Sequence, residues 1–156
     1  MPDTFTYAVT QVLSDEGGYV CDANDPGGAT NMGITQRDLP ETPIQNLTVA
    51  QAVAYYSNTY WKGLYSSLTS QQLANKLFDW GVLFGVGTAV KVLQGIIGIK
   101  QDGLFGPASL AAVNAADGVM LLEEYKNSML LHAEAVVAAN PTLTKFLAGW
   151  MRRINS

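Results

Sequence analysis

Glu16 is a residue whose type and position could do chemistry. It follows Val9, Val12 and Leu13 at spacings of seven, four and three residues, which places it on the apolar face of the helix predicted there. Burial and the negative end of the helix dipole both favour a neutral, protonated carboxyl at such a place. A general acid working near neutral pH needs this property. The spacing alone also fits a structural ion pair or a side chain turned outward.

A polar, glycine-rich loop follows Glu16 and carries two further candidates, Asp25 and Thr30. Within it, the run from Asp25 to Gly28 is typical of a tight turn, because proline presets one central residue and glycine allows a positive φ at the next. Such a turn can bring Asp25 and Thr30 toward Glu16. Two facing carboxyl groups, or one carboxyl and a positioned water, suit a glycosidase. The loop also fits an ordinary polar turn whose Asp and Asn side chains cap their own backbone.

Other chemistries lack parts in this sequence. A calcium loop starting at Asp22 would place Pro26 and Gly33 at ligand positions, and the paired glycines lack the Gly-Lys-Ser/Thr of a phosphate loop. The chain has one histidine, His132, and one cysteine, Cys21. Ser-His-Asp, Cys-His and zinc-amidase sites are therefore incomplete, and carboxylates remain as the plausible catalytic groups. We expect no metal and no cofactor.

The composition of the 156 residues indicates one domain with a net charge of -4. Residues 1–60 carry seven acids and one base, whereas residues 61–156 carry eight bases and six acids. Basic residues cluster only at Arg152–Arg153, which argues against nucleic-acid binding. The beginning of the chain shows no basic segment of a signal peptide. The apolar run from Trp80 to Ile99 contains Lys91 and Gln94, so we expect a buried core segment and no stable membrane insertion.

Apolar periodicity predicts helices through most of the chain. The expected helices cover 5–16, a segment from Thr48, a segment from about Ser70 to Phe84, 88–97, a short segment after Pro107, 118–139, and a last segment with Leu143, Phe146, Leu147 and Trp150. Gly17–Gly18 can end the first helix, and Asn140–Pro141 can end the long one. One strand candidate, Tyr19–Cys21, would pair with residues 32–35. The fold class is therefore all-α, or mainly helical with at most a small hairpin.

Several motifs carry a resemblance to a known family. The stretch EGGYVCDANDPGGATNMGIT, residues 16–35, closely resembles the signature of the glycoside hydrolase family 108 muramidases, which are lysozyme-like enzymes of phages and Gram-negative bacteria. Further matches to its motifs are Tyr60–Trp61, Phe78–Asp79, LQGIIGIKQDGLFGPAS at residues 93–109 and FLAGWMRRI at residues 146–154. The chain departs from the usual pattern at Cys21, Met32, Leu83 and Ser109, which affects the expected sugar contacts more than the chemistry.

The resemblance implies a single lysozyme-like unit over residues 1–156. Residues 1–90 would form a catalytic lobe, and residues 91–156 a peptidoglycan-binding-like helical lobe. It also implies cleavage of the β-1,4 bond between N-acetylmuramic acid and N-acetylglucosamine, with Glu16 as the catalytic acid. The order Glu16, Asp25, Thr30 resembles phage-type lysozymes, although their threonine comes one residue later. The residues expected to bind substrate are Tyr19, Asn31, Trp61, Asp79 and Trp80; packing roles for the aromatic ones, and a helix-capping or loop-orienting role for Asp79, remain open.

Two functions follow from this resemblance. The first is a peptidoglycan hydrolase, either a phage endolysin or a chromosomal relative, that acts as a monomer on glycan strands in the periplasm. Without a signal peptide, it would need a holin or an export route. The second is a non-catalytic protein that binds the cell wall or assists secretion on the same fold. The expected mechanism is inverting, with Asp25 as the base that activates or positions water.

Overall fold

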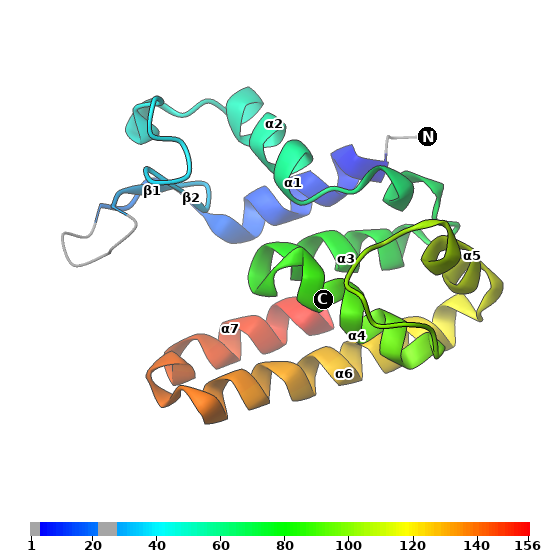
Figure 1. Ribbon diagram of the computed structural model, residues 1–156. Coiled ribbons are helices and arrows are strands. Elements are labelled where there is room, and N and C mark those ends of the chain that lie inside the picture. Colours follow the sequence, from blue (N-terminus) through cyan, green and yellow to red (C-terminus); the bar gives the residue numbers. More distant parts are fainter. Residues whose placement is uncertain (1–3, 22–27) are drawn as a thin grey trace. The chain divides into compact units, whose positions relative to one another are not determined.

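The computed structural model describes residues 4–21 and 28–156 (Figure 1). The chain forms two compact units, Met1–Trp61 and Lys62–Ser156, here called the N-terminal and C-terminal units. The family motif of the loop after Glu16 lies in the first unit. The two motifs at Phe78–Asp79 and at residues 146–154 lie in the second.

The N-terminal unit pairs two helices with a hairpin. Its elements are α1 (Thr4–Glu16), β1 (Thr30–Asn31), β2 (Ile34–Thr35), the 3-10 helix η1 (Ile44–Asn46) and α2 (Val49–Thr59). Thr48 caps α2: its hydroxyl accepts from the Gln51 amide, and the Gln51 side chain accepts from the Thr48 amide. Val9 and Val12 of α1 and Ala52 and Tyr56 of α2 are buried, so this unit has a small core.

The hairpin differs from the one expected from sequence. Residues 30–31 pair with residues 34–35 across the two-residue turn Met32–Gly33, and Val20 forms only an isolated bridge with Thr30. Both turn residues have positive φ, 50° for Met32 and 78° for Gly33, as the tightest hairpin turns require. The expected strand Tyr19–Cys21 is therefore reduced to one bridging residue, because the partner strand folds back on its own continuation.

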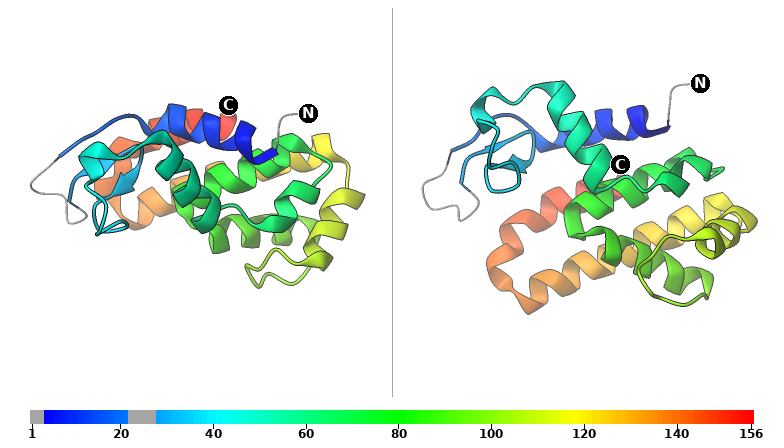
Figure 2. Two further views of the ribbon diagram at one scale, coloured as in Figure 1. Left: turned by 90° about the horizontal axis from the view of Figure 1, so that it is seen from above. Right: turned by 45° about the horizontal axis from the view of Figure 1, so that its top comes forward.

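The C-terminal unit is helical. Its elements are η2 (Gly63–Ser67), α3 (Gln71–Phe84), α4 (Val86–Ile97), α5 (Pro107–Ala115), α6 (Gly118–Ala139), η3 (Pro141–Leu143) and α7 (Thr144–Asn155). Ser70 and Asp117 cap α3 and α6 through their side-chain oxygens, and Pro107 opens α5. Helices α6 and α7 run side by side in opposite directions, as Figures 1 and 2 show. Trp80, Leu77, Tyr125 and Met129 lie at the centre of its core.

Buried polar groups fasten the loops of this unit. The Gln94 side chain, 2% exposed, donates to Asp102 Oδ1 at 2.9 Å and to Ser109 Oγ at 3.1 Å, and it accepts from the Gly103 amide at 3.0 Å. These bonds explain the spacing of the motif at residues 93–109, since one buried amide needs partners from both sides of the turn. The Lys76 ammonium likewise donates to the Arg153 carbonyl at 3.1 Å.

The mainly helical fold class with a small hairpin is confirmed, and the predicted helix from 118 to 139 matches α6 at both ends. Val49, the first residue of α2, is 60% exposed, whereas Ala52 and Tyr56 of the same helix are buried. Among the described residues, no helix combines the length and the apolarity that crossing a membrane requires. The apolar run from Trp80 to Ile99 is divided between α3 and α4 at Gly85, which has a φ of 92°.

Candidate active site

The Glu16 carboxyl stands at the last residue of α1, and the chain turns sharply after it. Gly17 has a φ of 78°, a conformation that glycine adopts without strain, so the helix ends there. Glu16 is partly buried, while Gly17 and Gly18 are exposed. The sequence prediction that the glutamate occupies the end of this helix is confirmed by its position. Its carboxyl is thereby fixed at a helix end and retains contact with solvent.

Gly33 forms the surface against which the Glu16 carboxyl lies. A Cβ placed on Gly33 would come within 2.7 Å of Glu16 Oε2 and within 2.6 Å of the Tyr56 hydroxyl oxygen. Any side chain at this position would therefore displace one of the two oxygen atoms. The Tyr56 ring is buried, and its hydroxyl donates to the Met32 carbonyl at 2.6 Å. α1, the hairpin turn and α2 thus converge on one carboxyl.

The hairpin is held in place by main-chain and amide hydrogen bonds. The amides of Val20 and Thr30 each donate to the other's carbonyl at 2.7 Å. The Asn31 side chain, 8% exposed, donates to the Ile44 carbonyl at 2.9 Å. The Gln36 side chain donates to the carbonyls of Leu39 and Thr42 and accepts from the Ile44 amide. These bonds fix the turn beside Glu16 without requiring a large core.

The structure brings some sequence-predicted residues together near this turn. Thr30 and Asn31 form β1 beside the turn that contacts Glu16. The Asn31 side-chain amide donates a hydrogen bond to the Ile44 carbonyl in η1. Tyr19 is 46% exposed, and Trp61, at the end of the unit, contacts the Phe5 ring with centroids 5.5 Å apart. Asp25 lies outside the described residues, and its place relative to Glu16 stays a prediction.

Asp79 and Trp80 belong to the C-terminal unit, in the buried part of α3. The Asp79 Oδ1 atom accepts from Arg153 Nε at 3.0 Å and from Arg153 Nη2 at 2.8 Å, which joins the motifs at Phe78–Asp79 and at 146–154. The Trp80 indole has no exposed surface and packs edge-on against Tyr125, with centroids 4.2 Å apart. As placed here, Trp80 offers no ring face to a sugar. The Asp79 carboxylate forms an ion pair with Arg153, and its helix-capping and loop-orienting roles stay predictions.

Two residues at the site had no predicted role in the sequence interpretation. Gly33 lies within the family motif, and Tyr56 lies in the helix predicted from Thr48, but neither was assigned a place at the site. The signal for the first was available: a two-residue segment containing glycine between Thr30–Asn31 and Ile34–Thr35 indicates a tight hairpin. The hydrogen bond from Tyr56 to a residue 24 positions earlier has no local sequence signal.

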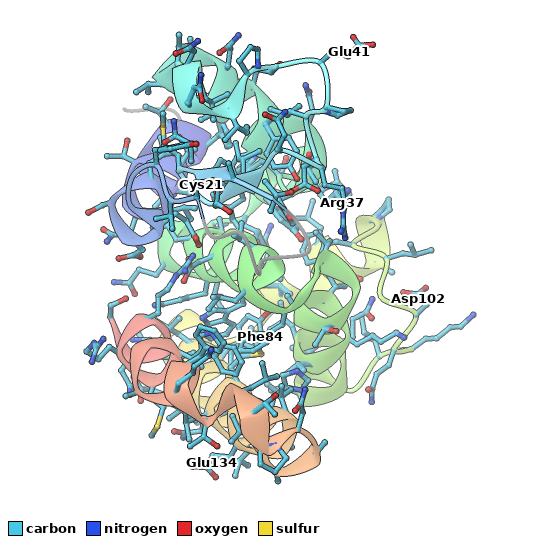
Figure 3. The ribbon with its side chains drawn as sticks, turned by 90° about the vertical axis from the view of Figure 1, so that its left-hand side faces the viewer. Cys21, Arg37, Glu41, Phe84, Asp102 and Glu134 are labelled. Atoms are coloured by element: carbon cyan, nitrogen blue, oxygen red, sulfur yellow. The ribbon has the colours of Figure 1, made fainter. Side chains whose placement is uncertain are left out.

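The part of this unit that the structure describes also contains side chains of types that can bind metals. Among the described residues, no group of three or more His, Cys, Asp or Glu side chains is placed to hold a metal ion. Cys21 is exposed, and its hydrogen bond with Tyr19 raises the pKa of the Tyr19 hydroxyl. Cys21 and Arg37, the one Lys or Arg within residues 1–60, are labelled in Figure 3.

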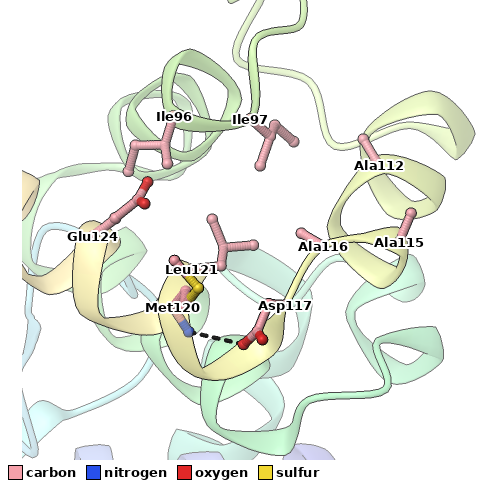
Figure 4. A pocket seen from close by; sticks show the side chains of 9 residues that line it. All are labelled: Ile96, Ile97, Ala112, Ala115, Ala116, Asp117, Met120, Leu121 and Glu124. Atoms are coloured by element: carbon pink, nitrogen blue, oxygen red, sulfur yellow. Dashed lines mark hydrogen bonds between the residues drawn. The ribbon is translucent and has the colours of Figure 1, made fainter.

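A separate hollow of about 380 Å³ lies within the C-terminal unit, between α4, α5 and the start of α6 (Figure 4). Its walls are largely apolar, with Ile96, Ile97 and Leu121 pointing inward, and two acids, Asp117 and Glu124, stand at its rim. Asp117 Oδ1 accepts from the amides of residues 119 and 120, so this carboxyl serves as a helix cap. Asp117 and Glu124 are both exposed, whereas the Glu16 carboxyl is partly buried.

Two family models and a solved structure match this chain. Residues 9–85 match the family model described as glycosyl hydrolase 108, and residues 88–155 match the model described as a predicted peptidoglycan domain. Among solved structures, the chain is similar to "Structure of Brucella abortus SagA", with 34% sequence identity and a TM-score of 0.80 over 97% of this chain and 90% of that one. No curated protein matches.

The chain therefore belongs to the glycosyl hydrolase 108 family. This membership makes it a glycoside hydrolase, and the second matched domain makes peptidoglycan its partner. The matched range 9–85 contains Glu16, Gly33 and Tyr56, so the site described above lies entirely in the hydrolase part of the match. The matched range 88–155 begins in α4 and ends at the last residue of α7.

Proposed function

We propose that the protein is an N-acetylmuramidase that cleaves the β-1,4 bond between N-acetylmuramic acid and N-acetylglucosamine, with Glu16 as general acid. The observation that carries the proposal is the placing of this carboxyl: it ends α1 and lies against the Cα of Gly33 and near the Tyr56 hydroxyl. A general acid must deliver its proton from a defined position. The end of α1, the turn at Gly33 and Tyr56 of α2 together hold the Glu16 carboxyl in such a position.

The partial burial of Glu16 supports the same role. A fully enclosed carboxyl could not reach the glycosidic oxygen of a polymer, so a general acid needs some contact with the solvent side. Glu16 is half-buried at the end of its helix, beside exposed glycines. A Cβ on Gly17 would meet no atom within 4 Å, so the chain beside Glu16 is open on that side.

Asp25 is proposed as the base that activates or positions the attacking water, and Thr30 is proposed as a second hydrogen-bond partner of that water. Inverting glycosidases keep their two carboxyl groups roughly 6.5–9.5 Å apart, whereas retaining ones keep them about 5–5.5 Å apart. Thr30 lies in β1, directly before the turn that contacts Glu16. Proton NMR during early turnover would show the α-anomer first for inversion, and the β-anomer first would contradict this assignment.

The division of labour proposed for the chain follows its two family matches. Residues 1–90 would act as the catalytic lobe, and residues 91–156 would hold the peptidoglycan. We propose that the protein works as a monomer on wall glycan in the periplasm, which it would reach through a holin or an export route. The excess of acids in residues 1–60 would slow its approach to an anionic wall at low ionic strength.

The test is the identity of the sugar released at the new reducing end. Purified sacculi are digested, reduced with borohydride and analysed by mass spectrometry. A muramidase yields muramitol at the new ends. Glucosaminitol would assign the other glycosidic bond, and free stem peptides without new reducing ends would indicate an amidase; either result contradicts the proposal. Sacculi that bind the protein but release nothing would favour a wall-binding protein without turnover.

A further inference from the structure

Four aromatic side chains from three helices meet on one surface of the C-terminal unit. Phe84, at the end of α3, contacts the rings of His132 on α6 and Trp150 on α7 edge-on, with centroids 5.2 and 5.3 Å apart. Phe146, one turn before Trp150, lies nearly parallel to it, with centroids 6.0 Å apart and planes at 21°. This group is called the aromatic platform; Figure 3 labels Phe84 within it.

The platform is partly open to solvent, unlike the aromatic core beneath it. Phe146 is 45% exposed, and the other three rings are half-buried. Trp80 and Tyr125, in the same unit, are fully buried. The Phe146 and Trp150 rings lie 21° from parallel with centroids 6.0 Å apart, within the range of stacked aromatic pairs. Burial also lowers the pKa of His132, which keeps this ring uncharged near neutral pH.

We propose that the aromatic platform binds a peptidoglycan glycan strand, with Phe146 and Trp150 stacking against sugar rings. The axial C–H bonds of a β-linked pyranose form an apolar face that packs flat on an aromatic ring, while its hydroxyl and acetamido groups stay in water. This assignment rests on the proposed function for the identity of the polymer. It is also supported by the match of residues 88–155 to a peptidoglycan domain, which contains His132, Phe146 and Trp150.

The charge beside the platform suits the same ligand. The Lys145 ammonium lies over the Phe146 ring, 5.1 Å from its centroid, on an exposed side chain. Stem peptides attached to the glycan carry carboxylates. A sugar that stacks on this face of the ring must displace the ammonium, which can then pair with those carboxylates. The platform thus offers an apolar surface for the sugar and a cation for the peptide that it carries.

Two other occupants fit the surface less well. A helix lying in a bilayer needs a continuous apolar face, but the apolar residues of α7 other than Phe146 are mostly turned inward, with Ile154 fully buried. A second protein chain needs about 800 Å² on each partner for a stable interface. One half-exposed phenylalanine with three half-buried neighbours falls far short of that area, whereas it matches the width of one or two sugar rings.

The test is co-sedimentation of the full chain with purified sacculi, using Glu16→Gln protein so that digestion does not complicate binding. Phe146→Leu keeps an apolar side chain of similar size and removes the ring. We expect it to weaken binding about five- to tenfold, the range that one aromatic contact contributes. The matched control is Leu131→Ala, because Leu131 neighbours His132 on α6 and is 67% exposed but is not part of the platform. It should bind like the parent, and both variants should keep the parent's thermal midpoint.

Two further probes identify the occupant. Glycan strands stripped of stem peptides by an amidase should retain the difference between Phe146→Leu and its parent. Vesicles of phosphatidylglycerol should bind neither protein. Equal binding of Phe146→Leu and parent to sacculi, no binding of the parent at all, a difference that disappears with the stem peptides, or a difference seen on vesicles would each overturn the proposal. A Glu16→Gln protein that still digests sacculi would count against the proposed function alone, because sedimentation at low temperature measures binding without cleavage.

Discussion

The two units of the chain achieve their geometry in different ways. In the N-terminal unit, the Glu16 carboxyl is positioned by main-chain features: a helix end at Gly17, a turn with two positive φ values, and carbonyl groups that accept from Tyr56, Asn31 and Gln36. In the C-terminal unit, long helices are joined by buried side chains, with ion pairs and amide hydrogen bonds between them. The reactive carboxyl therefore depends on backbone conformation, and the binding surface depends on side-chain packing.

Two buried tyrosines, one in each unit, make the same kind of hydrogen bond with different consequences. Tyr56 and Tyr125 are both buried, and each hydroxyl donates to a backbone carbonyl, that of Met32 at 2.6 Å and that of Ala89 at 2.5 Å. In the N-terminal unit this bond fixes the turn beside Glu16. In the C-terminal unit it joins α6 to α4 inside a helical core. The same chemistry thus serves the site in one unit and stability in the other.

An alanine in the turn beside Glu16 is the strongest test of the claim that backbone conformation positions this carboxyl. Gly33→Ala forces a Cβ into the space of the Glu16 and Tyr56 oxygens, and displacing a reacting group by about 1 Å can lower turnover about 100-fold. The left-handed backbone adds about 1–3 kcal/mol of strain. Hydrolysis of sacculi and the thermal midpoint should therefore both fall.

Gly98→Ala is the matched control in the C-terminal unit. Its φ is 75°, close to the 78° of Gly33, but a Cβ there meets no atom within 4 Å. It should lower the free energy of unfolding by roughly 1–2 kcal/mol and leave turnover per folded molecule unchanged. If both alanines reduce turnover equally, the contact with Glu16 is not what positions the carboxyl.

Removing a charge from the C-terminal unit should affect stability alone. Asp79→Asn leaves Arg153 without its partner carboxylate, where the two side chains are only 10% and 12% exposed, and it should destabilise the unit by about 2–4 kcal/mol. Urea unfolding measures the loss, and turnover of the remaining folded protein should match that of the parent. Glu134→Gln, at an exposed acid of α6 in the same unit, should leave the unfolding midpoint near the parent's. A specific loss of turnover in folded Asp79→Asn would instead support the substrate-binding role expected for this residue from the sequence.

The tyrosine pair gives a smaller and more selective effect. Tyr56→Phe and Tyr125→Phe each remove one hydroxyl from a buried ring, and each should lower the free energy of unfolding by about 1–2 kcal/mol. Only Tyr56→Phe should also reduce turnover, because only its bond fixes Met32 in the turn. Comparing kcat for the two variants at equal fractions folded separates positioning from stability. A turnover loss in Tyr125→Phe of the same size would contradict the division between the units.

The helices were largely predictable from the sequence, because local signals determine them. Apolar periodicity, the Thr48, Ser70 and Asp117 caps and the Gly106–Pro107 start each act within a few residues, and the observed ends agree with them. The position of Glu16 at a helix end followed from the same reasoning. The hairpin register was wrong, since Met32 takes a left-handed conformation that a non-glycine residue seldom adopts.

The contacts that required the three-dimensional structure join distant residues. Asp79 and Arg153 are 74 positions apart, and no local sequence pattern predicts that they form a pair. The four rings of the aromatic platform come from α3, α6 and α7, and nothing in the sequence indicated that they meet. The burial of Trp80 is of the same kind: its periodicity predicted an inward-facing side chain, and the neighbours that cover it come from another helix.

The central claim is that the Glu16 carboxyl donates the proton to the leaving sugar oxygen, and Glu16→Gln tests it most directly. The amide keeps the size and shape of the side chain but has no acidic proton. Release of reducing ends from sacculi should therefore fall about 10²–10⁴-fold, with an unchanged thermal midpoint and unchanged co-sedimentation. Near-normal release of reducing ends by a variant that is folded as stably as the parent would contradict the claim.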